Sequence, residues 1–217
     1  MKVFVSIPCY DRKITCETAR SLLMEQGAAT ALGIELQVSF VPGSSLITQA
    51  RNQAVKAFFD SGADRLVFID ADVAWEPGEL LKVASQPVDF CGGAYRYKDE
   101  EEAYPVGWIE ERDELWADPK TGLIEVAMLP GGFLSLSRAV FEKLAQAHPG
   151  RVYSFHGHPF QAFFHCPPGD GEDGAFCRDW RDIGGQIWLH PELSLTHVDG
   201  AHKYPGHIGN WLKNRGA

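Results

Sequence analysis

Two aspartates, Asp70 and Asp72, directly follow an apolar run and are spaced to hold a cation. The run, residues 66–69, is rich in strand formers and too short to cross a membrane, which predicts a buried strand. Residues two apart on a strand point to the same face, so both carboxylates can converge on one ion. Hard oxygen ligands of this kind suit Mg²⁺ or Mn²⁺ held beside substrate phosphates. The pair is also consistent with one aspartate that caps the next helix and one that is solvated.

The segments around this pair predict an α/β fold. Residues 3–7 read as an apolar strand, residues 34–40 alternate as in a half-buried edge strand, and residues 47–58 carry apolar side chains at helical spacing. In open α/β sheets, ligands bind at the carboxyl ends of the strands, where the aspartates are expected. The loop after the first strand carries Tyr10, whose ring can stack on a base, and Asp11, whose carboxylate can hydrogen-bond one.

Further periodic segments complete this expectation. Helices are expected at residues 15–26, after the turn at 75–78, at 138–147 and from residue 172 onward, and strands at 88–94, 122–128, 186–191 and 193–198. The pair Gly92 and Gly93 indicates a bulge or the close approach of a ligand. Arg51 lies beside the apolar stripe of its helix, and its residue type alone favours a solvent-exposed position, although a guanidinium there can reach a phosphate or pair with an acid.

Two segments lack regular patterning and are expected to be loops. Residues 98–122 are acidic and rich in turn formers, and residues 150–171 are interpreted as a mobile loop over the active site. An alternative for the second segment is a zinc site built from its metal-binding residue types, which are His156, His158, His165 and Cys166. These residues lack the paired spacing of zinc motifs.

Composition favours one soluble, cytoplasmic domain over residues 1–217. No apolar run approaches the roughly 20 residues that a spanning helix needs, and the N-terminus enters a strand without the shape of a signal peptide. The 5 cysteines form no C-x-x-C pair, which favours reduced thiols in a cytoplasmic protein. The net charge of −9 argues against broad binding of nucleic acid or an anionic membrane surface.

The order of several short motifs resembles the GT-A glycosyltransferases, especially the small family 2-like and mannosyltransferase-like members. The motifs are residues 7–11, 50–54, 68–73, 172–177, and 187–191 followed by 195–197. The resemblance spans most of the chain. It implies a Rossmann-like, mostly parallel central sheet flanked by helices. It also implies a nucleotide-binding half at residues 1–97 and an acceptor-binding half at residues 98–217.

The resemblance implies roles for residues on the donor side. The nucleoside pocket would be lined by Pro8, Tyr10 and Asp11. Arg51 would lie near the nucleotide or its diphosphate. Asp70 would lie near the ribose or a metal-bound water, and Asp72 would bind the metal directly. His197 stands where such enzymes supply a late ligand, and an imidazole suits Mn²⁺. The implied metal set is therefore Asp70, Asp72 and His197.

Roles on the acceptor side follow from the same resemblance. Gly131 and Gly132 match the segment that shapes the sugar and acceptor pocket around the donor. Asp173 matches the acid at a helix start that serves as the catalytic base in inverting members. Whether this chain inverts or retains the anomeric centre stays open.

The function that these residues predict is transfer of one sugar from a nucleotide sugar to an acceptor hydroxyl, with Mn²⁺ or Mg²⁺ as cofactor. A UDP-sugar donor is the habit of the family, and the acceptor is unknown. The Q-x-x-R-W motif of processive synthases is missing, which favours transfer of a single sugar. One alternative is a non-catalytic module that binds a nucleotide or a sugar. Another is a nucleotidyltransferase, which is disfavoured because the first loop has no glycine-rich, basic phosphate cradle.

Overall fold

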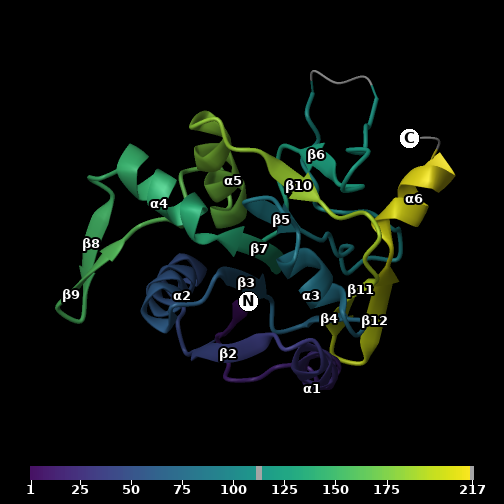
Figure 1. Cartoon of the computed structure of the whole chain (residues 1–217), viewed down its shortest axis with the longest axis horizontal. Helices are drawn as coiled ribbons and strands as arrows, with labels where there is room; N and C mark the ends of the chain where they lie inside the picture. The colour runs from purple at the N-terminus through teal and green to yellow at the C-terminus, as the bar shows by residue number, and fades with distance from the viewer. Residues whose placement is uncertain (111–113, 216–217) are drawn as a thin grey trace.

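The computed structural model describes residues 1–110 and 114–215, and within them the main sheet has seven strands. Their bounds are β1 (Lys2–Cys9), β2 (Glu35–Pro42), β3 (Arg65–Ile69), β5 (Phe90–Gly92), β6 (Ile124–Val126), β7 (Phe133–Ser137) and β10 (Ile187–Leu189). The spatial order is β2-β1-β3-β7-β5-β10-β6. The strands β2, β1, β3, β5 and β10 run in one direction, and β7 and β6 run against them. The expected mostly parallel α/β sheet is confirmed, with β2 at its edge (Figure 1).

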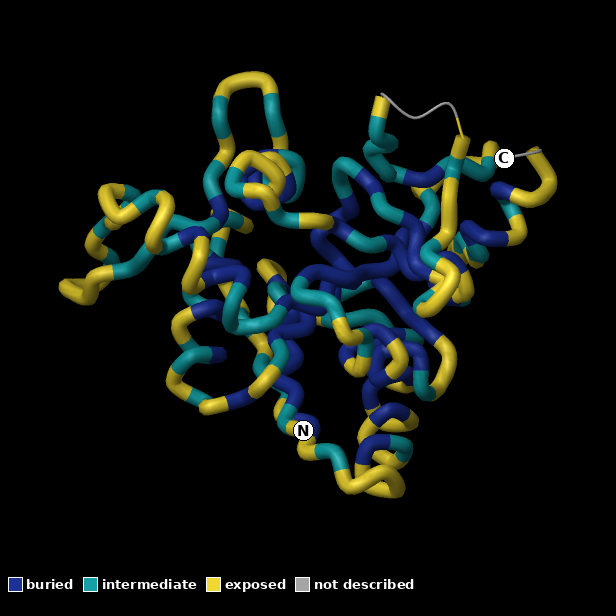
Figure 2. The backbone as a smooth tube through the Cα atoms, turned by 45° about the horizontal axis from the view of Figure 1, so that its top comes forward, coloured by how far each residue is buried: buried dark blue, intermediate teal, exposed yellow. Residues whose placement is uncertain are grey.

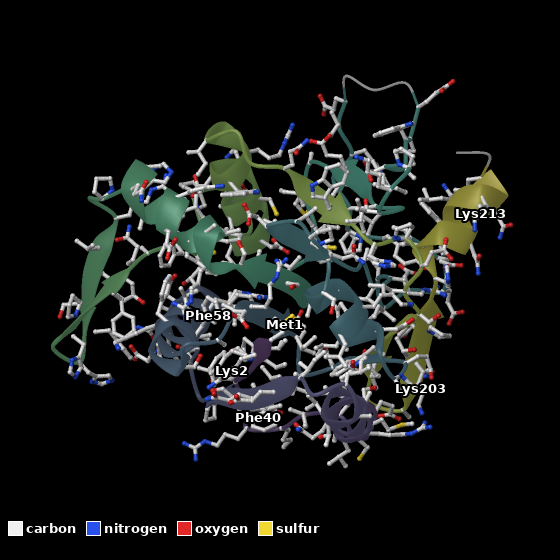
Figure 3. All side chains as sticks on the ribbon, in the orientation of Figure 1. Met1, Lys2, Phe40, Phe58, Lys203 and Lys213 are labelled. Atoms are coloured by element: carbon white, nitrogen blue, oxygen red, sulfur yellow. The ribbon has the colours of Figure 1, made fainter. Side chains whose placement is uncertain are left out.

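Helices cover both faces of this sheet. They are α1 (Cys16–Ala31), α2 (Ile47–Ser61), α3 (Glu79–Ala84), α4 (Arg138–Ala147) and α5 (Glu172–Asp182). Alternate residues of β1 enter different cores: Phe4 packs with apolar residues of α2, α4 and α5, whereas Val5 packs with those of α1 and α3. This period of two is what a strand buried on both faces requires. Figure 2 shows the buried residues gathered in the interior of the molecule, and Phe58 of α2, which is labelled in Figure 3, is fully buried.

A smaller sheet flanks the main one. Its strands are β4 (Val73–Trp75), β11 (Leu195–Asp199) and β12 (His202–Gly206), in the order β12-β11-β4. The helix α6 (Ile208–Arg215) follows β12, and both lie on the opposite side of the molecule from the hairpin of β8 (Val152–Phe155) and β9 (His158–Gln161) (Figure 1). Within the described residues, no helix has the length and apolar character needed to cross a membrane.

Most expected elements are confirmed, and α4 begins and ends at the expected residues. The α2 helix is capped at its C-terminus by Gly62, whose φ of 69° is the left-handed conformation that glycine tolerates. The interpretation of residues 150–171 as a loop without regular structure was wrong, because β8 and β9 pair through residues 152–161. The expectation also missed β4, β7, β12 and α6. Part of the expected loop at 98–122, residues 111–113, lies outside the described residues.

Candidate functional site

The two aspartates lie in a turn between sheets and not on a strand. β3 ends at Ile69 and β4 begins at Val73, so Asp70 and Asp72 occupy the connection from the main sheet to the smaller one. The backbone N–H of Val73 donates to the carbonyl of Asp70 at 3.2 Å, which closes this turn. The expectation that strand geometry would turn both carboxylates to one face was therefore wrong. The carboxylates have different partners.

Asp70 is held by two donors. Its Oδ1 lies 3.3 Å from Arg51 Nη2, and its Oδ2 accepts a hydrogen bond of 2.8 Å from the hydroxyl of Tyr95. Burial, together with the negative charge of Asp70, raises the pKa of Tyr95, so the phenol stays protonated and can donate. The ring of Tyr95 also meets the ring of His197 edge-on, with centroids 4.8 Å apart. Tyr95 therefore links Asp70 to the predicted histidine ligand.

Arg51 is buried, which corrects the solvent-exposed position that its residue type favours. Its side chain is 3% exposed, and its Nη1 donates to the carbonyl of Gly131 at 2.7 Å. Its guanidinium carbon lies 5.1 Å from the centre of the Phe68 ring and 5.7 Å from that of Phe164. The Nε atom faces Glu172 Oε1 at 3.4 Å. A planar guanidinium with several donors suits such a crowded, charged position better than an ammonium.

The glycines of the loop before β7 leave space for these side chains. A Cβ at Gly131 would lie 2.4 Å from Arg51 Nη2, and a Cβ at Gly132 would lie 2.2 Å from Asp70 Oδ2. The backbone of the loop is bonded to the acidic turn as well, because Asp70 N donates to the carbonyl of Gly132 at 3.0 Å. The predicted glycine pair thus adjoins the predicted aspartate. By contrast, a Cβ at Gly92 or Gly93 would meet core leucine side chains, so these two glycines serve close packing.

Asp72, His197 and Lys98 meet at one carboxylate oxygen. Lys98 Nζ lies 2.7 Å from Asp72 Oδ2, and His197 Nε2 lies 3.6 Å from the same atom. Burial alone would raise the pKa of Asp72, but the contacts of its carboxylate with His197 and with the Lys98 ammonium outweigh burial and lower the pKa to about 2. Asp72 is therefore ionised throughout the physiological range.

The contacts of His197 fit a cation at this position. Its Nδ1 lies 3.0 Å from the carbonyl oxygen of Arg96, which can only accept, so Nδ1 carries a hydrogen. When the ring is neutral, Nε2 has a lone pair that faces Asp72 Oδ2. Because Nε2 and Oδ2 are then both acceptors, a cation between them would be favourable. A backbone carbonyl that fixes the tautomer of a ligating imidazole is a recurrent feature of metal sites.

The full predicted metal set is not brought together. Asp72 and His197 adjoin, whereas Asp70 is directed to Arg51 and Tyr95. No group of three histidine, cysteine, aspartate or glutamate side chains able to hold a metal ion is found in the part of the chain that the structure describes. Asp72 and His197 would thus be the direct protein ligands of a divalent ion, and its remaining positions would be left for water and phosphate oxygens, as Mg²⁺ usually requires.

A cleft of about 620 Å³ opens beside the acidic turn. Its lining includes Pro8, Asp11, Lys13, Thr15, Asp70 and Asp72. The first loop and the acidic turn thus face one cavity, as carboxyl ends of neighbouring parallel strands should. Tyr10, on the same loop, is largely exposed and does not line this cleft, so its contact with a nucleoside stays a prediction.

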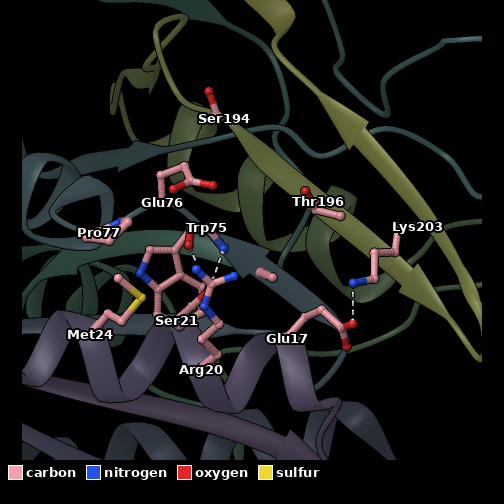
Figure 4. A pocket seen from close by; sticks show the side chains of 11 residues that line it. Glu17, Arg20, Ser21, Met24, Trp75, Glu76, Pro77, Ser194, Thr196 and Lys203 are labelled. Carbon is pink, nitrogen blue, oxygen red and sulfur yellow. Dashed lines mark hydrogen bonds and ion pairs between the residues drawn. The ribbon is translucent and has the colours of Figure 1, made fainter.

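A second cavity is lined by residues of α1 and of the smaller sheet, and contacts beside it hold β4 in place. The hydroxyl of Ser21 donates to the carbonyl of Trp75 at 2.7 Å, and Lys203 of β12 forms a 2.6 Å ion pair with Glu17 (Figure 4). The indole N–H of Trp75 donates to the buried Glu25 at 3.0 Å. These contacts from α1 fix the strand that leaves the acidic turn.

Asp173 lies in the first turn of α5, as predicted. Its Oδ1 accepts a hydrogen bond of 2.8 Å from the N–H of Gly174. Its neighbour Glu172 pairs with Arg51, which in turn pairs with Asp70, so the start of α5 lies close to the acidic turn. Two acids in the first turn also suit the positive end of the helix dipole.

The histidines of residues 156–165 do not form a zinc site within the described residues. His165 Nε2 lies 2.9 Å from Asp179 Oδ2, and Asp179 also pairs with Arg151. Beside it, the side-chain amide of Asn52 donates to the carbonyl of Phe164 and accepts from its N–H, both at 2.9 Å. These contacts bind residues 164–165 to α2 and α5.

Sequence reasoning missed Tyr95, Lys98 and Glu172 as members of this site. Lys98 begins an acidic run that was interpreted as a solvated loop, and Tyr95 directly follows the expected strand at 88–94, in which only the glycine pair was singled out. Glu172 was visible only as the neighbour of Asp173. A search for donors and cations near the ends of strands would have flagged Tyr95 and Lys98.

Solved structures that resemble this chain identify its fold. GalNAc-T7, solved with UDP, GalNAc and Mn²⁺, is 13% identical and has a TM-score of 0.51, with 92% of this chain and 44% of that one covered. A Drosophila β1,4-galactosyltransferase 7 variant, solved with manganese, UDP-Gal and xylobiose, is 15% identical with a TM-score of 0.50, over 99% of this chain and 73% of that one.

These two structural neighbours are GT-A glycosyltransferases, so the chain has the GT-A fold predicted from its motifs. The chain spans less than half the length of the GalNAc-T7 chain. An inositol-1-phosphate CTP transferase from T. maritima also matches, at 11% identity and a TM-score of 0.44, over 92% of this chain and 89% of that one. No protein-family model matches the sequence, and a search of curated proteins gave no significant match.

Proposed function

We propose that this protein is a glycosyltransferase that moves one sugar from a nucleotide sugar, with UDP as the expected nucleotide, to an acceptor hydroxyl. The observation that carries the proposal is that Asp72, whose carboxylate faces His197, lines the same cleft as Pro8 and Asp11. The two GT-A neighbours were solved with UDP or UDP-Gal and manganese, which supports a donor of the same class here.

The chemistry of the site suits the departure of a diphosphate. A divalent ion held by Asp72 and His197 would neutralise the negative charge that develops on the leaving group. Pro8 and Asp11 would bind the nucleoside, and Arg51 would act by holding Asp70, and with it the acidic turn, in position. In this proposal residues 1–97 bind the donor and residues 98–217 supply most of the acceptor site.

Asp173 is the proposed general base. A carboxylate that removes the proton of the attacking hydroxyl must reach it within roughly 2.6–3.2 Å. The start of α5 is held near the acidic turn through Glu172 and Arg51, which brings Asp173 to the same region. The hydrogen bond from Gly174 to Oδ1 leaves Oδ2 as the atom that would accept this proton.

The test is release of nucleotide from a panel of UDP- and GDP-sugars in the presence of Mn²⁺. The wild-type chain should hydrolyse at least one donor slowly, and Asp72→Ala should abolish this while the circular dichroism spectrum stays unchanged. Asp60→Ala is a matched control, because Asp60 is an exposed aspartate on α2 outside the cleft. Equal turnover by wild type and Asp72→Ala would contradict the proposal.

Asp173→Asn separates an enzyme from a non-catalytic binding module. As the general base, Asp173 should contribute about 100-fold or more to the rate while leaving donor affinity nearly unchanged. A binding module would bind the donor, release no nucleotide in any form, and show no effect of this substitution.

A further inference from the structure

Lys98 is delivered to the acidic turn by a loop that is closed on itself. The N–H of Tyr97 donates to the carbonyl of Ala103 at 2.9 Å, and Arg96 Nη2 donates to the carbonyls of Asp99 and Glu100 at 2.6 and 3.0 Å. The stem of Lys98 therefore starts from a defined position. Its side chain is 31% exposed, so it lies at the edge of the site and not in free solvent.

The same loop holds the imidazole of His197. The carbonyl of Arg96, two residues before Lys98, accepts from His197 Nδ1 and so directs Nε2 toward Asp72. One loop thus supplies both the atom that orients the histidine and the ammonium that contacts Asp72. That ammonium lies against Oδ2, the oxygen that the histidine also faces.

This position is the one that a divalent cation bound by Asp72 and His197 would need. A cation shared by both side chains must contact Asp72 Oδ2 on the side facing Nε2. Lys98 Nζ already contacts that oxygen at 2.7 Å, and two positive charges at such separation repel each other strongly in a half-buried site. The four-carbon stem of a lysine has enough rotatable bonds to withdraw the ammonium while the closed loop stays in place.

We propose that Lys98 is the resident cation of the donor site and competes with a divalent ion for Asp72. When the ion binds, Lys98 must release Asp72, so the lysine weakens divalent-ion affinity and keeps the carboxylate neutralised when no ion is present. This inference rests on the proposed function for the identity of the site. Its measurement uses the metal alone, so it is independent of whether a nucleotide sugar binds.

The experiment is titration of the full chain with Mn²⁺, followed by electron paramagnetic resonance of the free ion. Lys98→Met should tighten Mn²⁺ binding by about fivefold, because the competing charge is lost and the length of the side chain is kept. Lys98→Arg should stay near the wild-type affinity. If Lys98 has only a structural role, Lys98→Met will weaken Mn²⁺ binding or leave it unchanged. Either result would overturn the proposal.

Lys56→Met is a matched control for the change in net charge. Lys56 also forms a 2.7 Å pair with an aspartate, Asp60, but on the exposed face of α2. Its loss should not alter Mn²⁺ affinity, and an equal gain in both methionine variants would attribute the effect to net charge and contradict competition at Asp72. Lys98→Gln provides a second uncharged variant if the methionine form folds poorly. A wild type that binds Mn²⁺ but no nucleotide sugar would contradict the proposed function alone.

Discussion

Arg51 Nη2 lies 3.3 Å from Asp70 Oδ1, and this ion pair joins the interior of α2 to the turn that leaves β3. The guanidinium is almost completely buried, yet it also faces Glu172 at the start of α5. One buried cation thus holds carboxylates from two segments about a hundred residues apart. It fixes the distance between the acidic turn and the helix that carries Asp173.

Replacing this cation should destabilise the protein strongly. Arg51→Met leaves Asp70 and Glu172 without their buried partner, and the loss should be about 3 kcal/mol of the free energy of unfolding. Lys56→Met, on the same helix but in an exposed pair, should cost less than about 1 kcal/mol. Urea unfolding of both variants measures the difference, and equal small losses would show that Arg51 does not support the site.

A methyl group on Gly132 should displace Asp70. The added Cβ would lie 2.2 Å from Asp70 Oδ2 and 2.5 Å from the Tyr95 hydroxyl, so the turn must shift. Gly132→Ala should therefore weaken Mn²⁺ and nucleotide binding by tenfold or more. Gly27→Ala is the matched control, because nothing lies within 4 Å of its added Cβ in the helix α1, and it should stabilise by about 0.4–1 kcal/mol. Isothermal titration of both variants decides the matter, and unchanged affinity in Gly132→Ala would count against the site.

The segment after the β8–β9 hairpin should depend on Asn52. Its amide makes two buried hydrogen bonds with the backbone of Phe164, and Asn52→Ala leaves that N–H and carbonyl unsatisfied. The expected cost is about 2 kcal/mol. Amide exchange at residues 163–166 should rise more than in α4. If Asn52→Ala increases amide exchange equally in residues 163–166 and in α4, the contact does not hold this segment specifically.

His190 should make stability depend on pH in the acidic range. Burial, together with the charge of Lys82, lowers its pKa from 6.5 to about 4, so the folded state favours the neutral ring. The stability that the folded state gains from keeping His190 neutral is fully present above pH 6.5. It is lost as the pH falls from about 6.5 to 4, because the unfolded state then binds the proton first. Relative to pH 7, His190→Gln should reduce the loss of stability at pH 4 by about 2 kcal/mol, after allowance for solvent screening. Urea unfolding at the two pH values tests this, and identical pH dependence in both proteins would contradict it.

Much of the fold could be predicted because local pattern and tertiary structure agree. The strands β1 and β3 are continuous apolar runs, and α2 and α4 have clear inward stripes with recognisable ends. Two of the missed features, β12 and the hairpin of β8 and β9, have no such pattern. β12 contains a proline and exposed polar residues, and the hairpin of β8 and β9 lies largely at the surface, so neither shows a strong period of burial.

The site was predicted only in part, because its contacts join residues far apart in the sequence. The positions of Asp72 and His197 could be expected from motif order, and the structure places them together. For Arg51, the residue type alone favoured an exposed position, and only the resemblance implied a place near the diphosphate. Its burial depends on carboxylates supplied by the end of β3 and by α5, which no local pattern shows. Lys98 could not be found from local pattern, because a lysine in an acidic run is usually solvated.

The most direct test of a donor site at the acidic turn is thermal unfolding of the protein with UDP and Mn²⁺, alone and together. A ligand at one hundred times its dissociation constant adds about 2.7 kcal/mol to the free energy of unfolding, which gives a clear rise in Tm. We expect a rise in Tm with UDP that is larger in the presence of Mn²⁺ and is lost in Asp72→Ala. No rise with UDP, GDP or their sugars, with or without Mn²⁺, would contradict a donor site at the acidic turn.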